Sequence, residues 1–155
     1  MKTHSLLLIL AFPLLQAFAG CDFARPNNDA DLSFENQDDP IAQLINDLRT
    51  SGATVERAGK ISQPFFSVEG QLLKIGGEYV QVFAFAKAAE AAAEAARVSP
   101  DGTSFKTDET AWMVTWIGPP HFFKKDRLIV LYVGGSVFVV DALERVLGSQ
   151  FAGRQ

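Results

Sequence analysis

The spacing of apolar residues predicts three helices. In 41–48 every third or fourth residue is apolar, and the preceding Asp39-Pro40 pair is suited to begin a helix. Alanine, the residue with the highest helix propensity, fills most of 86–98. A third helix is predicted over 137–147, after a Gly-Gly-Ser turn. The β-branched start of this last segment also suits the extension of a strand.

Other segments are apolar at every second position or at nearly every position, which is typical of strands. They are 53–62, 71–75, 78–86, 111–118 and 127–134. The Gly76-Gly77 pair between two of them indicates a hairpin. The order of one helix, three strands, a helix, two strands and a helix predicts an α+β domain. Its sheet is expected to be mostly antiparallel, with about five strands and two or three helices packed on one face.

Two rows of side chains are expected from these periods. In the alanine-rich helix the charged residues fall on one stripe, predicted to face solvent while the alanines lie against the sheet. They are Lys87, Glu90, Glu94 and Arg97. In 111–118 the large apolar residues at a spacing of two, Trp112, Val114 and Trp116, are predicted to face the core.

The first twenty residues have the layout of a secretory signal peptide. A short, weakly basic start precedes an almost unbroken apolar run over 6–18, and small residues follow. This run of about 13 residues is shorter than the ~20 that a transmembrane helix needs. We therefore predict that 1–20 is a signal peptide and exclude it from the fold.

The only cysteine of the chain, Cys21, follows the segment Phe18-Ala19-Gly20. This arrangement resembles the lipobox of bacterial lipoproteins, although Leu is usual in the family at the position of Phe18. The resemblance implies cleavage between Gly20 and Cys21, acylation of the Cys21 thiol and anchoring in membrane lipid. The alternative is ordinary signal-peptidase cleavage after Ala17-Phe18-Ala19, which would release a soluble protein with a free thiol.

The segment 22–39 carries six acidic residues and one basic residue and is poor in apolar side chains. Such a composition does not bury enough surface to fold, so 21–39 is predicted to be a lipidated N-terminus followed by a disordered acidic tether. Fully extended, its 18 residues after the cysteine would span ~60 Å, and as a flexible coil roughly 20–25 Å.

The rest of the chain, 40–155, suits a single domain. It carries 12 basic and 12 acidic side chains, so the acidity of the whole chain belongs to the tether. Nucleic-acid binding needs a clustered basic surface. The densest group, Lys124, Lys125 and Arg127, is small, and no nucleic-acid partner is predicted.

The sequence offers no complete set of catalytic or metal-binding residues. Nucleophilic catalysis needs a base oriented by a third group, and a zinc site needs three or four ligands. The part of the chain after the leader holds one histidine, His121. We therefore expect no metal and no cofactor, and the missing set argues against an enzyme. The alternative is an unrecognised extracytoplasmic hydrolase that uses His121 with a nearby carboxylate.

Aromatic residues beside prolines suggest a binding surface instead. Pro119-Pro120 stiffens the predicted loop 116–126, and a second aromatic pair follows Pro64. Exposed aromatic side chains are a common basis for partner recognition. The candidate binding residues are Phe65, Phe66, His121, Phe122 and Phe123. The alternative is that these rings close the ends of the sheet as core.

The segments "QPFFSVEGQLLKIGGEYVQVFAFA", "RVSPDGTSF" and "PPHFFKKDRLIVLYVGG" resemble small, uncharacterised bacterial lipoproteins and secreted proteins. The resemblance spans about 60–153 and implies no activity. It supports the class of a membrane-anchored, extracytoplasmic lipoprotein. The aromatic residues beside prolines and the missing catalytic set then predict a binding or accessory module for a protein or small molecule. Such a protein would face the periplasm or the cell exterior. Asp22, directly after the cysteine, resembles the signal for retention at the inner membrane of two-membrane bacteria.

Overall fold

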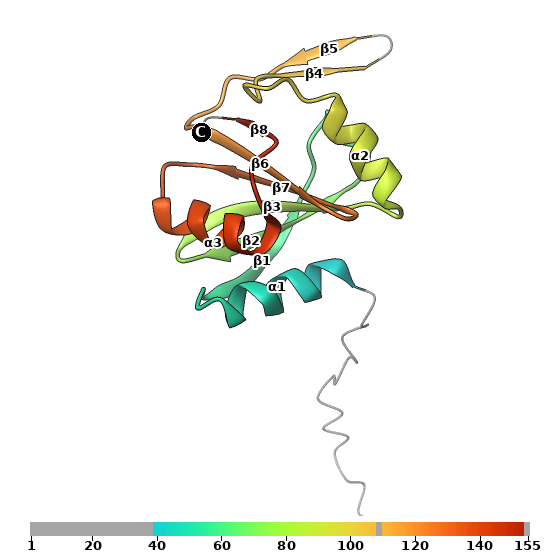
Figure 1. The fold of residues 1–155 in the computed structure, drawn as a ribbon. Coiled ribbons are helices and arrows are strands. Elements are labelled where there is room, and N and C mark those ends of the chain that lie inside the picture. Colours follow the sequence, from blue (N-terminus) through green and yellow to red (C-terminus); the bar gives the residue numbers. More distant parts are fainter. Residues whose placement is uncertain (1–38, 108–109, 154–155) are drawn as a thin grey trace, which may run out of the picture. The chain divides into compact units, whose positions relative to one another are not determined.

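An antiparallel sheet of six strands forms the centre of the described chain, in the order β1-β2-β3-β7-β6-β8. The computed structural model describes residues 39–107 and 110–153 (Figure 1). The predicted leader, lipidation site and tether lie outside these residues, apart from Asp39. The elements are α1 (Pro40–Thr50), β1 (Val55–Ile61), β2 (Gly70–Ile75), β3 (Glu78–Ala84), α2 (Ala88–Ala96), β4 (Ser104–Lys106), β5 (Ala111–Met113), β6 (Pro120–Lys125), β7 (Leu128–Val133), α3 (Val137–Leu147) and β8 (Ala152–Gly153).

The predicted α+β class is confirmed, but the strand count is wrong. The main sheet has six strands instead of about five, and β4 and β5 form a separate two-stranded sheet. Strand β6 was missed because Pro119-Pro120 indicated a loop. Pro120 is the first residue of the strand, where its missing N–H costs no ladder bond.

Side chains of the central strands alternate between two apolar layers. On β7, Val130 belongs to the layer that also contains α1 and α3, whereas Ile129 and Leu131 belong to the opposite layer. Strand β7 therefore reads as a continuous apolar run, because both of its faces are covered.

The three helices lie on both faces of the sheet. Helices α1 and α3 pack on the same face of the sheet, the face of Val130. Their side chains there include Leu44, Leu48 and Leu143. Helix α2 packs on the opposite face through Ala91 and Ala95, together with phenylalanines of the second layer. The prediction of helices on one face is therefore wrong for α2. Figure 1 shows α1 and the β4–β5 hairpin at opposite ends of the view.

The start of α1 follows the prediction. Asp39 is its N-cap and accepts a hydrogen bond from the Ile41 N–H at 2.9 Å, with Pro40 in the first turn. In α2 the predicted exposed stripe is broken, because Glu94 is buried. Its carboxylate accepts a hydrogen bond from the Arg97 guanidinium at 2.7 Å, and this pairing satisfies the buried charge.

Candidate functional site

The five residues predicted to form a binding surface are buried. None of them exposes more than 8% of its surface, and Phe122 and Phe123 expose none. They are Phe65, Phe66, His121, Phe122 and Phe123. The predicted exposed patch is thus corrected to core. His121, Phe122 and Phe123 are buried because β6 is an inner strand of the sheet and buries side chains on both of its faces. Phe65 and Phe66 lie between β1 and β2 and are buried against the rings of Phe105 and Phe83.

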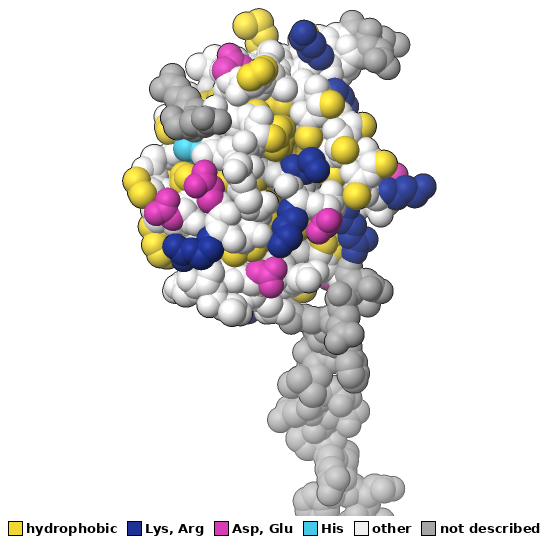
Figure 2. Space-filling view, viewed as in Figure 1, with side chains coloured by type: hydrophobic (Ala, Val, Ile, Leu, Met, Phe, Trp, Pro, Cys, Tyr) yellow, Lys and Arg dark blue, Asp and Glu magenta, His cyan; other side chains and the backbone are white. Residues whose placement is uncertain are grey.

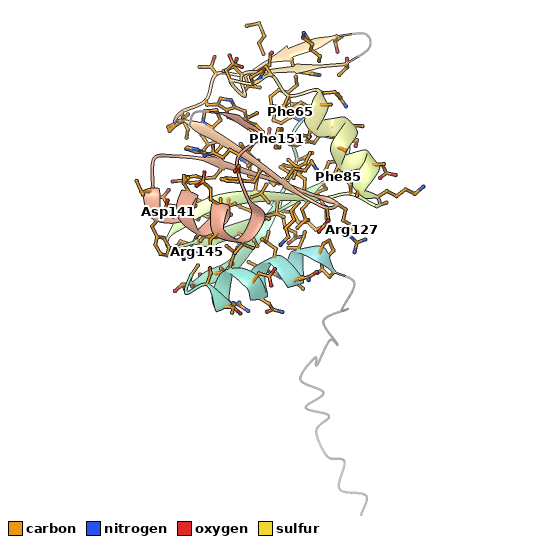
Figure 3. The ribbon with its side chains drawn as sticks, viewed as in Figure 1. Phe65, Phe85, Arg127, Asp141, Arg145 and Phe151 are labelled. Carbon is orange, nitrogen blue, oxygen red and sulfur yellow. The ribbon has the colours of Figure 1, made fainter. Side chains whose placement is uncertain are left out.

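The buried rings support the β4–β5 hairpin. Phe65 stacks on Phe105 of β4 with ring centroids 3.8 Å apart, and Trp116 meets Phe65 edge-on at 6.1 Å. The Trp116 indole N–H donates to the Gly102 carbonyl at 2.8 Å. Figure 3 shows Phe65 and Phe151 between the main sheet and the hairpin. This aromatic layer fixes the hairpin against the sheet.

His121 ties the C-terminal segment to the sheet. Its Nδ1 contacts Gln150 Oε1 at 2.8 Å, its Nε2 contacts the Gly134 carbonyl at 3.0 Å, and its ring stacks on Tyr132. The Gln150 amide in turn donates to Glu144 at 3.2 Å. Both imidazole nitrogens therefore meet oxygens of an amide or of the backbone. In the described part of the chain no carboxylate reaches the ring directly, as general-base catalysis by a His-acid pair would require.

The described residues contain no group of three or more His, Cys, Asp or Glu side chains placed to hold a metal ion. In the glycine turn before α3, the Ser136 N–H already donates to the Tyr132 hydroxyl at 3.0 Å, so this N–H is not free to bind an anion. Between the start of α1 and the end of α3 lies a hollow of about 310 Å³. It is lined by charges of both signs, Asp47 and Asp126 against Lys125 and Arg127. Its charge therefore selects neither anions nor cations.

Large apolar side chains are exposed in two places. The first is β5 and the residues after it, where Met113 is 86% exposed, Ile117 102% and Trp112 44%. The second lies where α3 begins, beside the β2–β3 turn. Its members are Tyr79, Val137 and Phe138. Figure 2 shows apolar side chains at the surface over both regions.

A groove of about 540 Å³ lies beside the first of these regions. Its lining residues come from the 99–103 turn, the segment after β5 and the C-terminal strand. They are Asp101, Thr103, Val114, Thr115, Trp116, Ile117, Gly118, Pro119, Pro120 and Gly153. We call this groove, together with Trp112, Met113 and Ile117, the β5 surface. It combines apolar side chains with one carboxylate.

Asp101 gives the groove a fixed negative charge. Its carboxylate accepts hydrogen bonds from the Ser99 hydroxyl and from the backbone N–H and hydroxyl of Thr103. These bonds, that of Ser99 first, lower the pKa of Asp101 from 3.8. At neutral pH the group is therefore ionised, and it makes no ion pair within the described residues.

A carboxyl NMR titration should find the pKa of Asp101 below its ordinary value, and Ser99→Ala should move it back upward. Because the folded-state pKa is the lower one, these bonds stabilise the turn above the ordinary carboxyl pKa. Their contribution is lost as the pH falls through the lowered value. An unchanged titration midpoint in Ser99→Ala would show that the Ser99 hydroxyl is not the main cause.

The sequence contained a signal for Met113 and Ile117. Trp112, Val114 and Trp116 were predicted to face the core. Val114 and Trp116 are partly buried, but the prediction is wrong for Trp112, which is 44% exposed. In an extended segment the residues between and after them face the other way. The strand predicted over 111–118 is shorter in the structure, where only 111–113 pairs in a sheet.

No family model, curated protein or solved structure matches this chain. Among the described residues, no helix has the length and apolar character needed to cross a membrane. The candidate site therefore rests on the geometry of the β5 surface alone.

Proposed function

We propose that this protein is a lipid-anchored, extracytoplasmic binding module that contacts its partner through the β5 surface. The observation that carries the proposal is the exposure of Trp112, Met113 and Ile117 within six residues, beside a groove. Exposed apolar side chains gathered in this way mark interaction sites in soluble domains. The contacts of His121 give the hydrolase alternative no comparable support.

The anchor is supported by the N-terminal sequence, with its signal-peptide layout and the small residues before Cys21. The fold is compatible with it. The described chain begins at Asp39 and enters α1, which lies on the sheet face opposite the layer that supports β4–β5.

Intact-mass measurement of the membrane-extracted protein tests the anchor. We expect a chain that begins at Cys21 and carries a lipid-sized mass increment, and the Cys21→Ala variant should lack the increment. A soluble, unmodified chain that begins at Gly20 would refute the anchor.

The same membranes test the binding surface when a photo-crosslinking amino acid replaces Met113. We expect a discrete adduct that Ile117→Ser abolishes and the matched surface variant Tyr79→Ser leaves unchanged. Tyr79 is a suitable control because it is also exposed and belongs to the other apolar region. An adduct that survives Ile117→Ser would argue against this surface.

A further inference from the structure

The free edges of the two sheets differ in how they are protected. Strand β1, at one edge of the main sheet, is exposed over most of its length and carries Glu56, Arg57 and Lys60. Its register shifts between Arg57 and Gly59, where Gly59 has a positive φ of 130°. Charges and a bulge are the usual devices that keep an edge from pairing with another chain.

Two other edges are covered by the chain itself. At the far edge of the main sheet, the Gly153 N–H of β8 donates to the Pro100 carbonyl at 3.0 Å. Beside β4, the Ser99 N–H donates to the Ser104 carbonyl at 2.8 Å, and the Lys106 N–H donates to the Arg97 carbonyl at 2.9 Å. Residues 97–99 thus occupy the outer side of β4.

The outer edge of β5 is the exception. The hydrogen bond from the Val114 N–H to the Thr103 carbonyl, 2.9 Å, sets the phase of the hairpin. Antiparallel pairs alternate between bonded and non-bonded, so Met113 and Ala111 occupy non-bonded pairs. Their N–H and C=O groups point away from β4, toward the open edge. Within 39–107 and 110–153 no backbone group pairs with them.

The surroundings of this edge lack the protection seen on β1. None of the three β5 residues is charged, and the edge is followed by exposed Ile117 and by the groove that holds Asp101. The β5 surface therefore combines unpaired backbone groups, exposed apolar side chains and one carboxylate.

The exposed apolar area of the β5 surface favours an extended peptide over a folded protein as the partner. An interface between two folded proteins buries about 800 Å² on each side. Even a large side chain buries no more than about 250 Å², and Trp112 is already more than half buried, so the three exposed apolar side chains of the β5 surface fall short of that area. A second folded copy of this chain would find too little to cover, whereas a single extended segment gains most of its affinity from backbone hydrogen bonds.

We propose that the β5 surface binds an extended peptide, which adds to the free edge of β5 as a third strand. Its apolar side chains pack on Met113 and Ile117, and a lysine or arginine side chain reaches Asp101. This inference rests on the proposed function and names the kind of partner: an apolar strand with one basic residue. Backbone pairing provides affinity, and the groove with its carboxylate provides selectivity.

Selection from a display library of random nine-residue peptides tests the proposal, with the purified full chain as the target. We expect the enriched peptides to alternate apolar and polar residues and to carry one basic residue. N-methylation of one alternate set of backbone amides should abolish their binding, whereas N-methylation of the other set should leave it unchanged. Enrichment of no peptide, or of peptides without this alternation, would overturn strand addition.

Two matched variants separate the backbone from the side chain. Met113→Ser keeps the outward N–H, whereas Met113→Pro removes it without touching a bond to β4, since the pair is non-bonded. We expect Met113→Pro to weaken binding of the selected peptide by about tenfold relative to Met113→Ser. Equal affinities of the two variants would contradict pairing at the edge.

Two further measurements distinguish the remaining outcomes. Asp101→Asn should weaken the binding of peptides that carry Lys or Arg and leave the binding of their norleucine counterparts unchanged. An equal loss of affinity for both kinds of peptide would exclude the contact between Asp101 and the basic side chain. Sedimentation of the chain alone should show a monomer. A dimer that dissociates in Met113→Pro would mean that a second copy of this chain, and not a peptide, binds the edge of β5. These assays do not depend on lipidation of Cys21. Loss of the anchor in the intact-mass measurement would therefore leave the peptide inference standing, and failure of the peptide selection would leave the anchor standing.

Discussion

Replacing Phe122 with alanine should lower the free energy of unfolding by about 3–5 kcal/mol. The ring is fully buried in the aromatic layer, with centroids 5.9 Å from Phe105, 6.1 Å from Trp116 and 6.0 Å from Phe151. It also lies directly against the backbone of Gly102. Its removal leaves a cavity that the strands on either side of β6 do not close. The measurement is urea denaturation, with a lower midpoint at an unchanged slope.

Phe138→Ala is the matched control, because it removes the same atoms from a ring that is 52% exposed at the start of α3. Phe138→Ala should lower the free energy of unfolding by less than about 1.5 kcal/mol, because about half of the side chain stays exposed to water in the folded protein and so contributes no burial. Similar losses in the two variants would mean that Phe122 is not the core residue that the structure shows.

The burial of Phe122 also decides how binding can be tested. A serine at Phe65 or Phe122 would abolish binding by unfolding the support of the hairpin, whatever the partner contacts. Variants of Met113 and Ile117 remove exposed side chains and leave the aromatic layer in place. Substitutions on the β5 surface therefore report on recognition, and substitutions in the rings report on stability.

Local signals in the sequence were sufficient for most elements. The Asp39-Pro40 pair marks the start of α1, and Gly76-Gly77 marks the turn between β2 and β3, because each depends on a few adjacent residues. Strand β6 was hidden because its short apolar core stands between two prolines and two lysines. Its identity as a strand depends on pairing with β7 and β8, which no local pattern contains.

The placement of α2 and of the binding residues depended on tertiary structure. Helical spacing put Glu94 on a polar stripe, but the face of the sheet that α2 covers is set by the whole fold, and Glu94 is buried there beside Arg97. Likewise, aromatic residues near prolines suit both an exposed loop and a core. The sequence predicted a binding surface at Phe65, Phe66 and 121–123, and this prediction is wrong because all five side chains are buried. The surface that we propose instead contains Met113 and Ile117, which are exposed.

Replacing Gly153 with alanine should cost at least about 2 kcal/mol and release the C-terminal strand. Gly153 has a φ of 104°, which side chains rarely adopt, and a Cβ at this position would overlap the Pro120 carbonyl across the β6–β8 pair. Relief of this overlap moves β8 away from β6. The Phe151 N–H, which donates to Phe122 at 2.9 Å, then becomes accessible to solvent. Denaturation and hydrogen exchange at this amide measure the two effects.

Gly135→Ala is the control for this change. A Cβ on Gly135 meets no atom within 4 Å, and its φ is not positive, so alanine should fit there without loss of stability. If Gly153→Ala unfolded like Gly135→Ala and kept the Phe151 amide protected, β8 would not be held as closely as the structure shows. If the Phe151 amide instead exchanges fast in Gly153→Ala, we expect the contact between Gln150 and His121 to be lost as well, because Gln150 belongs to the same segment. Strand β8 and His121 therefore hold the C-terminal segment against β6 together, next to the groove that Gly153 helps to line.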